Sequence, residues 1–378
     1  MHQQISRVTF FTRRAGPLLF GLLLATAVRA DILVGQSTGL SGQIAAGSQE
    51  NVAGAKLYFD NVNANGGING EKIVLETLDD AYDPKRTAEN ARKLIEEKNV
   101  VAMFLTRGTP TTEAIIPLLD KYRVPLVGPS SGAMVLRQPF KPMLYHVRAT
   151  YQHESERCVE LLTAMGQTKF AVLYQESSFG RDALAGAERG FAKAKLKPVL
   201  SQAFTPDKLD FAPAVAELVK GGTESVLLFA TETPAIAFVK ELRKASRTVQ
   251  VATISNNATS GFPVGLGDLG RGTVVSQVVP NPSSLSIPLV KEITAIAKAK
   301  GVAEVTPTMI EGFVAAKVLA EGMRRAGGKI TRASLVDGLN SLKNYDVGGM
   351  SMNYSADRHD GADFVELSTI SRDGRFQR

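Results

Sequence analysis

The sequence predicts an α/β protein with two doubly wound parallel-sheet units, and two observations carry this prediction. From residue 32 onward, short apolar runs alternate with longer amphipathic stretches, which is typical of parallel strands whose crossover helices cover both faces of a sheet. The alternation breaks near residues 146–152 and then restarts, so we expect two units of similar build. A chain of 378 residues is long enough for two domains.

The first series runs from residue 32 to residue 129. We expect strands at 32–37, 72–78, 100–105 and 124–129, and helices at 48–65, at 84–98 and after Thr111. The turn NGGING (65–70) should join the first helix to the second strand, because Gly and Asn tolerate the positive φ of a tight return. Asp83 and Pro84 should start the helix at 84–98, since Asp caps helix N-termini and Pro presets the first φ.

The second series has the same pattern. We expect strands at 170–174, 198–204, 225–230 and 249–254, and helices at 180–195, 211–220 and 234–245. Three more helices should follow at 286–300, 308–326 and 331–342, with Gly327-Gly328 as a stop signal.

The first 30 residues have the pattern of a secretory leader rather than of the fold. A basic start with Arg7, Arg13 and Arg14 precedes an apolar stretch at 16–27 that is too short to span a bilayer. Val28-Arg29-Ala30 offers small residues at the −3 and −1 positions of a cleavage site. We expect cleavage after Ala30 and export to the periplasm; a retained anchor and a twin-arginine signal are the alternatives.

Composition narrows the function classes. Removing the four arginines of this leader lowers the net charge from +7 to +3, and no basic run with interleaved aromatics remains, so we expect no nucleic-acid partner. The single cysteine, Cys158, cannot form an intramolecular disulfide, and its place in a helical pattern predicts a buried structural thiol.

Catalytic motifs are weak. GPSSG (128–132) fits G-x-S-x-G, but a hydrolase triad would have to use His359, and no HGGG-type oxyanion segment precedes the serine. His146, His153 and His359 lack metal-ligand spacing, and no phosphate-binding glycine motif is present. We therefore expect a binding protein without metal or cofactor, with a serine hydrolase as the remote alternative.

Three segments together resemble a known family. GGING (66–70), DDAYDP (79–84) and SFG (178–180) are similar to segments of type I periplasmic binding proteins, specifically the branched-chain amino acid-binding group, and the similarity covers nearly the whole chain after residue 31. The resemblance implies two lobes that close on a small-molecule ligand. It also implies an inner-membrane ABC permease and its ATPases as partners.

The resemblance also implies three hinge crossings between the lobes. They should lie near 149–151, near 280–282 and around 354–357, before a last strand at 364–371. Lobe one would then comprise residues 31–149 plus 281–354, and lobe two residues 150–280 plus 355–378.

Ligands of open α/β sheets bind at the carboxyl ends of the strands, which selects a few turns of this sequence. In lobe one these are 39–47, 107–112 and 129–132; in lobe two they are 176–181, Glu232 and 255–257. Free N–H groups, helix dipoles and the hydroxyls of Thr109, Thr111, Ser130 and Ser131 favour a carboxylate there, as the resemblance also implies. The alternative is that Thr111 and Thr112 only cap the helix.

Further site residues come from the resemblance. Phe179 matches an aromatic that closes over the ligand, although it could instead pack on the sheet. Ala45 and Ala46 stand where relatives place a large aromatic wall, which would leave room for a bulkier ligand. Tyr151 lies at the first hinge. Arg107 could pair with an anion or be solvated.

The ligand class follows from a departure from the family pattern. Amino acid-binding members hold the ammonium with an acidic side chain in the turn after the strand at 249–254, but this turn reads Ser255-Asn256-Asn257-Ala258. A buried ammonium without an ionised partner is costly. We expect Asn256 in the site and a small carboxylate or amide-bearing ligand with an apolar or aromatic body. Branched-chain amino acids, with Glu232 as ammonium partner, are the second candidate, and a ligand sensor is a further alternative.

Overall fold

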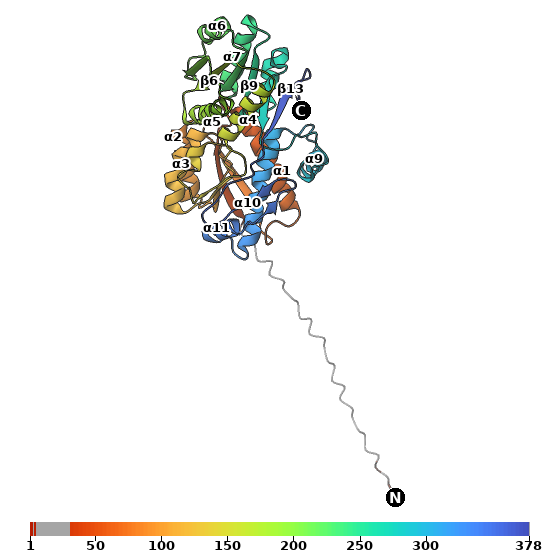
Figure 1. The fold of residues 1–378 in the computed structure, drawn as a ribbon. Helices are drawn as coiled ribbons and strands as arrows, with labels where there is room; N and C mark the ends of the chain where they lie inside the picture. The colour runs from red at the N-terminus through yellow and green to blue at the C-terminus, as the bar shows by residue number, and fades with distance from the viewer. Residues whose placement is uncertain (3, 5–30, 378) are drawn as a thin grey trace.

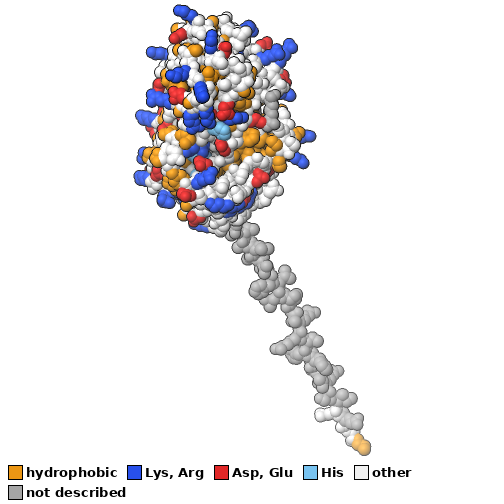
Figure 2. All heavy atoms as spheres, in the orientation of Figure 1, with side chains coloured by type: hydrophobic (Ala, Val, Ile, Leu, Met, Phe, Trp, Pro, Cys, Tyr) orange, Lys and Arg blue, Asp and Glu red, His pale blue; other side chains and the backbone are white. Residues whose placement is uncertain are grey.

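The computed structural model describes residues 1–2, 4 and 31–377, and the predicted leader lies almost wholly outside the described residues. From residue 31 the chain forms two α/β lobes stacked one above the other (Figure 1). Basic and acidic side chains are interspersed over the face seen in Figure 2. In the described part of the chain, no helix combines the length and apolarity needed to cross a bilayer.

The first lobe is built on a parallel sheet with strand order β2-β1-β3-β4-β5. Its strands are β1 (Ile32–Thr38), β2 (Ile73–Asp79), β3 (Ala102–Phe104), β4 (Leu126–Val127) and β5 (Leu144–Tyr145). Its helices are α1 (Ala45–Ala64), α2 (Pro84–Arg92), α3 (Thr109–Tyr122), α9 (Pro288–Ala299), α10 (Pro307–Ala326) and α11 (Arg332–Asn340). A separate hairpin pairs β11 (Tyr345–Asp346) with β12 (Ser351–Met352).

The second lobe has a mixed sheet with order β14-β13-β10-β9-β8-β6-β7. Its strands are β6 (Phe170–Gln175), β7 (Leu200–Phe204), β8 (Ser225–Phe229), β9 (Gln250–Thr253), β10 (Val274–Gln277), β13 (Glu366–Ile370) and β14 (Phe376–Gln377). Its helices are α4 (Tyr151–Ala164), α5 (Ser178–Ala194), α6 (Ala212–Lys220), α7 (Glu232–Ala245) and α8 (Gly261–Leu266). The sheet is parallel from β7 to β10, and β13 and β14 then run antiparallel at the edge.

The predicted fold class is confirmed, and three local differences have physical reasons. Strand β10 was not predicted, because no helix follows it and the strand–helix alternation stops at residue 254. The antiparallel pairing of β13 exists because this strand returns from the other lobe instead of following a crossover helix. The helix predicted at 84–98 is α-helical only to Arg92 and continues as a π-helical turn at Lys93–Glu97.

Several local predictions are confirmed. The Asp83 carboxylate accepts from the Lys85 N–H at 2.8 Å and so caps α2. In NGGING, the residues Gly66, Gly67, Asn69 and Gly70 all have positive φ. Cys158 is fully buried, and burial raises the pKa of its thiol, as expected for an unreactive structural cysteine.

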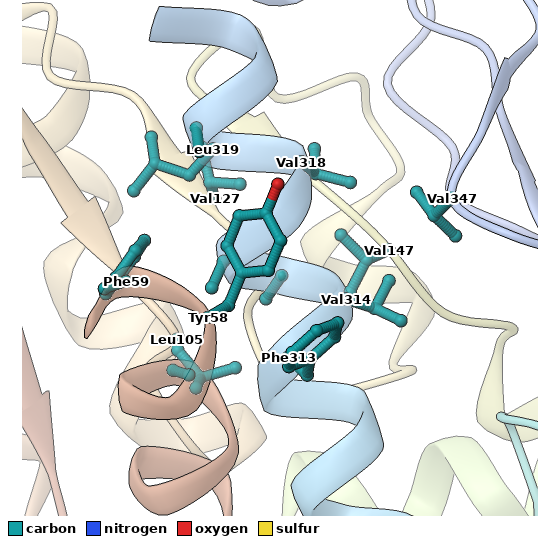
Figure 3. Close-up of a cluster of buried hydrophobic side chains, with 14 of the residues drawn as sticks. Tyr58, Phe59, Leu105, Val127, Val147, Phe313, Val314, Val318, Leu319 and Val347 are labelled. Carbon is teal, nitrogen blue, oxygen red and sulfur yellow. The ribbon is translucent and has the colours of Figure 1, made fainter. Parts of the chain in front are cut away.

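The core of the first lobe forms where α1 and α10 cross (Figure 3). Tyr58 of α1 and Phe313 of α10 meet edge to face, with ring centroids 5.0 Å apart. The crossing is close because Gly54 lies against the Met309 carbonyl and Gly312 lies against the Asn51 carbonyl. This contact fixes the start of α1, and with it one wall of the space between the lobes.

The chain passes between the two sheets three times. The passages lie between β5 and β6, between β10 and α9, and between β12 and β13. The hinge residues inferred from the resemblance fall within these connections, and the exact boundaries stay predictions.

Candidate functional site

A narrow pocket lies where the carboxyl ends of strands from both sheets face each other. The cavity itself measures about 20 Å³, roughly the room that one water molecule needs, so side chains nearly fill the space between the lobes. Its lining residues follow β1 to β4 in one lobe and β6, β8 and β9 in the other, together with the first crossing; they are Ile44, Tyr82, Arg107, Gly108, Ser130, Arg148, Tyr151, Phe179, Thr231, Glu232 and Asn256. The strand-end rule therefore locates the pocket, although it does not select every residue.

The predicted site residues divide into two sets. Ser130, Tyr151, Phe179, Glu232 and Asn256 line the pocket. Thr109, Thr111, Ser131 and Ala46 do not belong to its lining. Ala46 lies instead at the contact between the lobes, where a Cβ added to Gly261 of α8 would be 2.9 Å from its own.

The three hydroxyls outside the lining bond within the protein. Thr109 Oγ1 and Ser131 Oγ lie 2.8 Å apart, and both side chains are fully buried. Thr111 donates its hydroxyl to the Arg107 carbonyl at 2.7 Å. The alternative that Thr111 and Thr112 cap α3 is wrong: Gly108, with φ 103°, occupies the N-cap position, and both hydroxyls bond back to carbonyls of this turn.

Several backbone donors of these turns are also occupied. The N–H of Ser130 donates to the Thr106 carbonyl at 2.7 Å, and that of Ser131 to the Pro129 carbonyl at 2.8 Å. Gly108 N–H donates to the Ser130 carbonyl at 3.4 Å. These three groups were expected to be free for a ligand, but bonds between the two turns and, for Ser131, within its own turn use them.

Arg107 is buried, with 7% of its surface exposed, so the alternative of a solvated strand-end arginine is wrong. Its Nη1 donates to Asn51 Oδ1 at 2.6 Å and to Ser130 Oγ at 3.2 Å. Its Nη2 donates to the Asn256 carbonyl of the other lobe at 2.9 Å. The guanidinium thus crosses the space between the lobes.

Arg148, the other arginine of the lining, is neutralised within the protein. It bonds to Glu154 at 2.6 Å and to Glu311 at 3.3 Å, and its guanidinium lies 4.9 Å from the Tyr151 ring centroid. Burial opposes the charge, but attraction by Glu311 and Glu154 outweighs it and raises the pKa of Arg148. Because Glu154 and Glu311 belong to different lobes, this cluster also ties the lobes together beside the pocket.

Glu232 supplies the carboxylate of the pocket lining. Burial raises its pKa above the ordinary range, although the Thr259 hydroxyl donates to it and Arg107 attracts its charge. Nearby, Asn256 donates its amide N–H to the Ala230 carbonyl at 2.8 Å, while its Oδ1 has no hydrogen-bond partner among the described residues. This side of the pocket therefore offers acceptor atoms.

The apolar wall consists of aromatic rings and one aliphatic side chain. Tyr151 and Phe179 meet edge to face with centroids 5.1 Å apart, and Ile44 and Tyr82 complete the wall. Tyr82 and Thr231 were missed, but a signal existed for each: Tyr82 follows the strand β2, and Thr231 follows β8. Arg148 had no such signal, because its place depends on the hinge.

The arrangement can bind a polar ligand. Among the described residues it shows no pairing of Ser130 with a histidine base. Ser130 Oγ accepts from Arg107, while His359 bonds to the Leu144 carbonyl and to Asn340. Among residues 31–377, no group of three His, Cys, Asp or Glu side chains has the geometry of a metal site.

Comparisons with known proteins agree with this geometry. Residues 31–374 match the family described as periplasmic binding protein. A crystal structure of a substrate-binding periplasmic protein from Ralstonia solanacearum is 34% identical, with a TM-score of 0.85, and the match covers 92% of this chain and 99% of that one.

Curated relatives are more distant. The Leu/Ile/Val-binding protein homolog 3 of Brucella melitensis is 25% identical over 88% of this chain and 89% of its own length. The Leu/Ile/Val-binding protein homolog 7 of Brucella suis is 27% identical over 57% of this chain, and the match spans 56%, about half, of that relative.

Proposed function

The chain belongs to the periplasmic binding protein family, and we propose that it is a solute receptor whose two lobes close on a small carboxylate-bearing ligand with an apolar or aromatic body. We further propose that it acts in the periplasm and delivers this ligand to an inner-membrane ABC permease. The leader predicted at residues 1–30 and the family membership support this assignment.

The observation that carries the proposal is the pocket at the strand ends, which is lined from both lobes. A ligand that contacts Ser130 on one side and Phe179 and Asn256 on the other gains contacts that exist only when the lobes are together. Such a ligand favours the closed form by that difference in contacts.

The ligand class follows from the lining. Phe179, Tyr151 and Ile44 offer apolar contact, while Arg107 brings a positive charge that suits a carboxylate. A small monocarboxylate with a branched aliphatic or aromatic body satisfies both.

A second candidate is a branched-chain amino acid, as the names of the Brucella relatives suggest. Glu232 and the unpartnered Oδ1 of Asn256 favour it, because together they could accept from an ammonium. The raised pKa of Glu232 means that an ammonium would have to stabilise the ionised carboxylate.

Thermal-shift screening tests the function. The panel contains leucine, valine, their 2-oxo acids, aromatic acids and the corresponding amides. A micromolar ligand at millimolar dose stabilises by about 4 kcal/mol, which gives a clear rise in melting temperature. Stabilisation by the deaminated acids supports the first candidate; stabilisation by leucine or valine alone supports the second. No stabilisation by any member contradicts both.

A genetic test separates delivery from sensing. Deletion of the gene should abolish high-affinity uptake of the ligand that the screen identifies. Unchanged uptake of every solute that binds would instead favour a sensor that passes closure to another protein.

A further inference from the structure

We propose that the guanidinium of Arg107 binds the anionic group of the ligand, so that this site selects a carboxylate by direct charge pairing. The inference rests on the proposed function and names the group that determines its ligand class.

The two arginines of the pocket differ in how their charges are compensated. Arg148 lies between Glu154 and Glu311, so its charge is already compensated. Arg107 is also buried, but its three hydrogen-bond partners are an amide oxygen, a hydroxyl and a backbone carbonyl, and none carries a charge. Glu232 lies near enough to attract the charge of Arg107 but forms no ion pair with it among the described residues. A buried charge without a counter-ion is unfavourable, and a ligand carboxylate supplies the counter-ion.

Arg107 also keeps hydrogen-bond donors that the protein does not use. A guanidinium has five N–H donors, and the three hydrogen bonds of Arg107 use both hydrogens of Nη1 and one of Nη2. Nε–H and one Nη2 hydrogen have no acceptor among the described residues and are left for a ligand. This is the number of donors that a carboxylate engages when it binds an arginine through two parallel hydrogen bonds.

Several other donors of the lobe-one turns are used within the protein. The hydroxyls of Thr109 and Ser131 bond to each other, and the N–H groups of Ser130 and Ser131 bond to backbone carbonyls. The turns of lobe one therefore present Arg107 as their main positive group.

Two residues of α1 hold Arg107 in place. The Asn51 amide donates to the Thr308 carbonyl at 2.9 Å, which directs its Oδ1 toward Arg107 Nη1. Gly47 leaves room for the guanidinium, since a Cβ there would lie 2.4 Å from Nη2 and 2.7 Å from Cζ. Arg107 is thus positioned from within lobe one while its Nη2 reaches Asn256 of lobe two.

The test compares acids with their amides, because the two differ mainly in the charge that Arg107 recognises. The pairs are L-leucine and L-leucinamide, 4-methylpentanoate and 4-methylpentanamide, and benzoate and benzamide. Calorimetric titration measures each pair with the wild-type chain, Arg107→Gln and Arg107→Lys.

We expect the wild-type protein to prefer the acid of the pair that binds by roughly 10- to 100-fold, the range of a hydrogen bond to a charged group. Arg107→Gln should reduce that preference to less than about 3-fold, mainly because the affinity for the acid falls. Arg107→Lys should retain part of the preference for the acid, because lysine keeps the positive charge but lacks the two parallel N–H donors of a guanidinium.

Two further variants guard against indirect effects. Arg92→Gln removes a positive charge from the last turn of α2, where Arg92 is exposed and pairs with Glu96, and it should leave the preference unchanged. Gly47→Ala keeps Arg107 but displaces its guanidinium. It should therefore also lower the affinity for the acid more than the affinity for the amide.

The outcomes separate the two proposals. If the wild-type protein binds a pair and Arg107→Gln, folded by circular dichroism, keeps the wild-type preference for the acid, Arg107 is not the anion partner and the receptor function stands. If the wild-type protein binds acid and amide equally, the inference also fails. If no member of any pair binds, the proposed ligand class itself is wrong.

Discussion

At the scale of single residues, the pocket contains a buried cation, Arg107, and a half-buried acid, Glu232, that do not form an ion pair with each other. Arg107 attracts the charge of Glu232, but the carboxylate of Glu232 accepts from Thr259, and the guanidinium donates to uncharged groups. Each of the two groups therefore remains able to pair with a charged group of a ligand. This separation is the feature of the site that sequence patterns could not indicate, because it depends on which neighbours each side chain meets.

The protonation of Glu232 gives a prediction for stability. Its folded-state pKa is raised by burial, so the stabilisation from the protonated carboxyl is present at low pH and lost as pH rises through the folded pKa. Glu232→Gln should therefore raise the melting temperature near neutral pH by roughly 1–3 °C. The difference should shrink below about pH 4, where the wild-type carboxyl becomes mainly protonated in both the folded and the unfolded state.

Glu224 provides a control of opposite sign. The N–H groups of Thr168 and Lys169 hold the pKa of its carboxyl below the ordinary value, so its contribution is present at neutral pH and lost as pH falls. Glu224→Gln should lower the melting temperature at neutral pH and lose its effect in acid. If both variants shift the melting curve in the same direction at all pH values, the assignment for Glu232 is wrong.

At the scale of elements, the crossing of α1 and α10 connects core packing to the site. Asn51, whose carbonyl lies against Gly312, is the residue whose side chain fixes Arg107. Glycine in a helix interior usually costs stability relative to alanine, so its use at Gly54 and Gly312 reflects the close approach of the two backbones. The helical periodicity predicted both helices, but not that each glycine lies against the backbone of the other helix.

Gly312→Ala tests this crossing. The new Cβ would lie 2.1 Å from the Asn51 carbonyl oxygen, and a shift of α1 is needed to relieve the overlap. We expect the free energy of unfolding, measured with urea, to fall by about 1–3 kcal/mol despite the better helix propensity of alanine. Gly328→Ala, where no atom lies within 4 Å of the added Cβ, should change it by less than about 0.5 kcal/mol. Equal effects of the two substitutions would contradict a tight crossing.

At the scale of the whole molecule, polar side chains bridge the two lobes around the pocket. Ser178 donates to Glu113 at 2.5 Å, Ser260 N–H donates to Glu50 at 2.8 Å, and Thr231 donates to Gln43 at 2.9 Å. These bonds exist only while the lobes are close, so the structure is that of a closed form. In solution the balance between closed and open forms should depend on them and on the ligand.

X-ray scattering measures this balance. For the chain from Asp31, we expect ligand to lower the radius of gyration, and we expect Glu113→Ala to have a larger radius than the wild-type protein without ligand. Its affinity should fall severalfold, because part of the binding energy then closes the lobes. Glu241→Ala breaks the Lys244 pair within α7 and should change neither quantity. A radius that is the same with and without saturating ligand would argue against closure.

The sequence by itself determined most of the longer elements and their order. Strand and helix periodicity, the Asp83 cap and the positive-φ turn NGGING are local properties, and each residue's neighbours along the chain suffice to express them. The strand-end rule then selected the turns of the pocket, because the end of a strand is also defined locally. Strand β10 was not predicted, because no helix follows this short apolar run to continue the alternation of strands and helices.

Only the tertiary structure decided which polar groups of these turns are free. Thr109 meets Ser131 across 22 residues of sequence, Arg107 meets Asn256 across 149, and Arg148 meets Glu311 across 163. Whether a buried donor is used inside the protein or left for a ligand depends on such distant pairings, since every buried polar group takes the partner that packing brings to it. For this reason the sequence identified the hydroxyl-rich turns, while the fold placed the unpaired charge of Arg107 between the lobes.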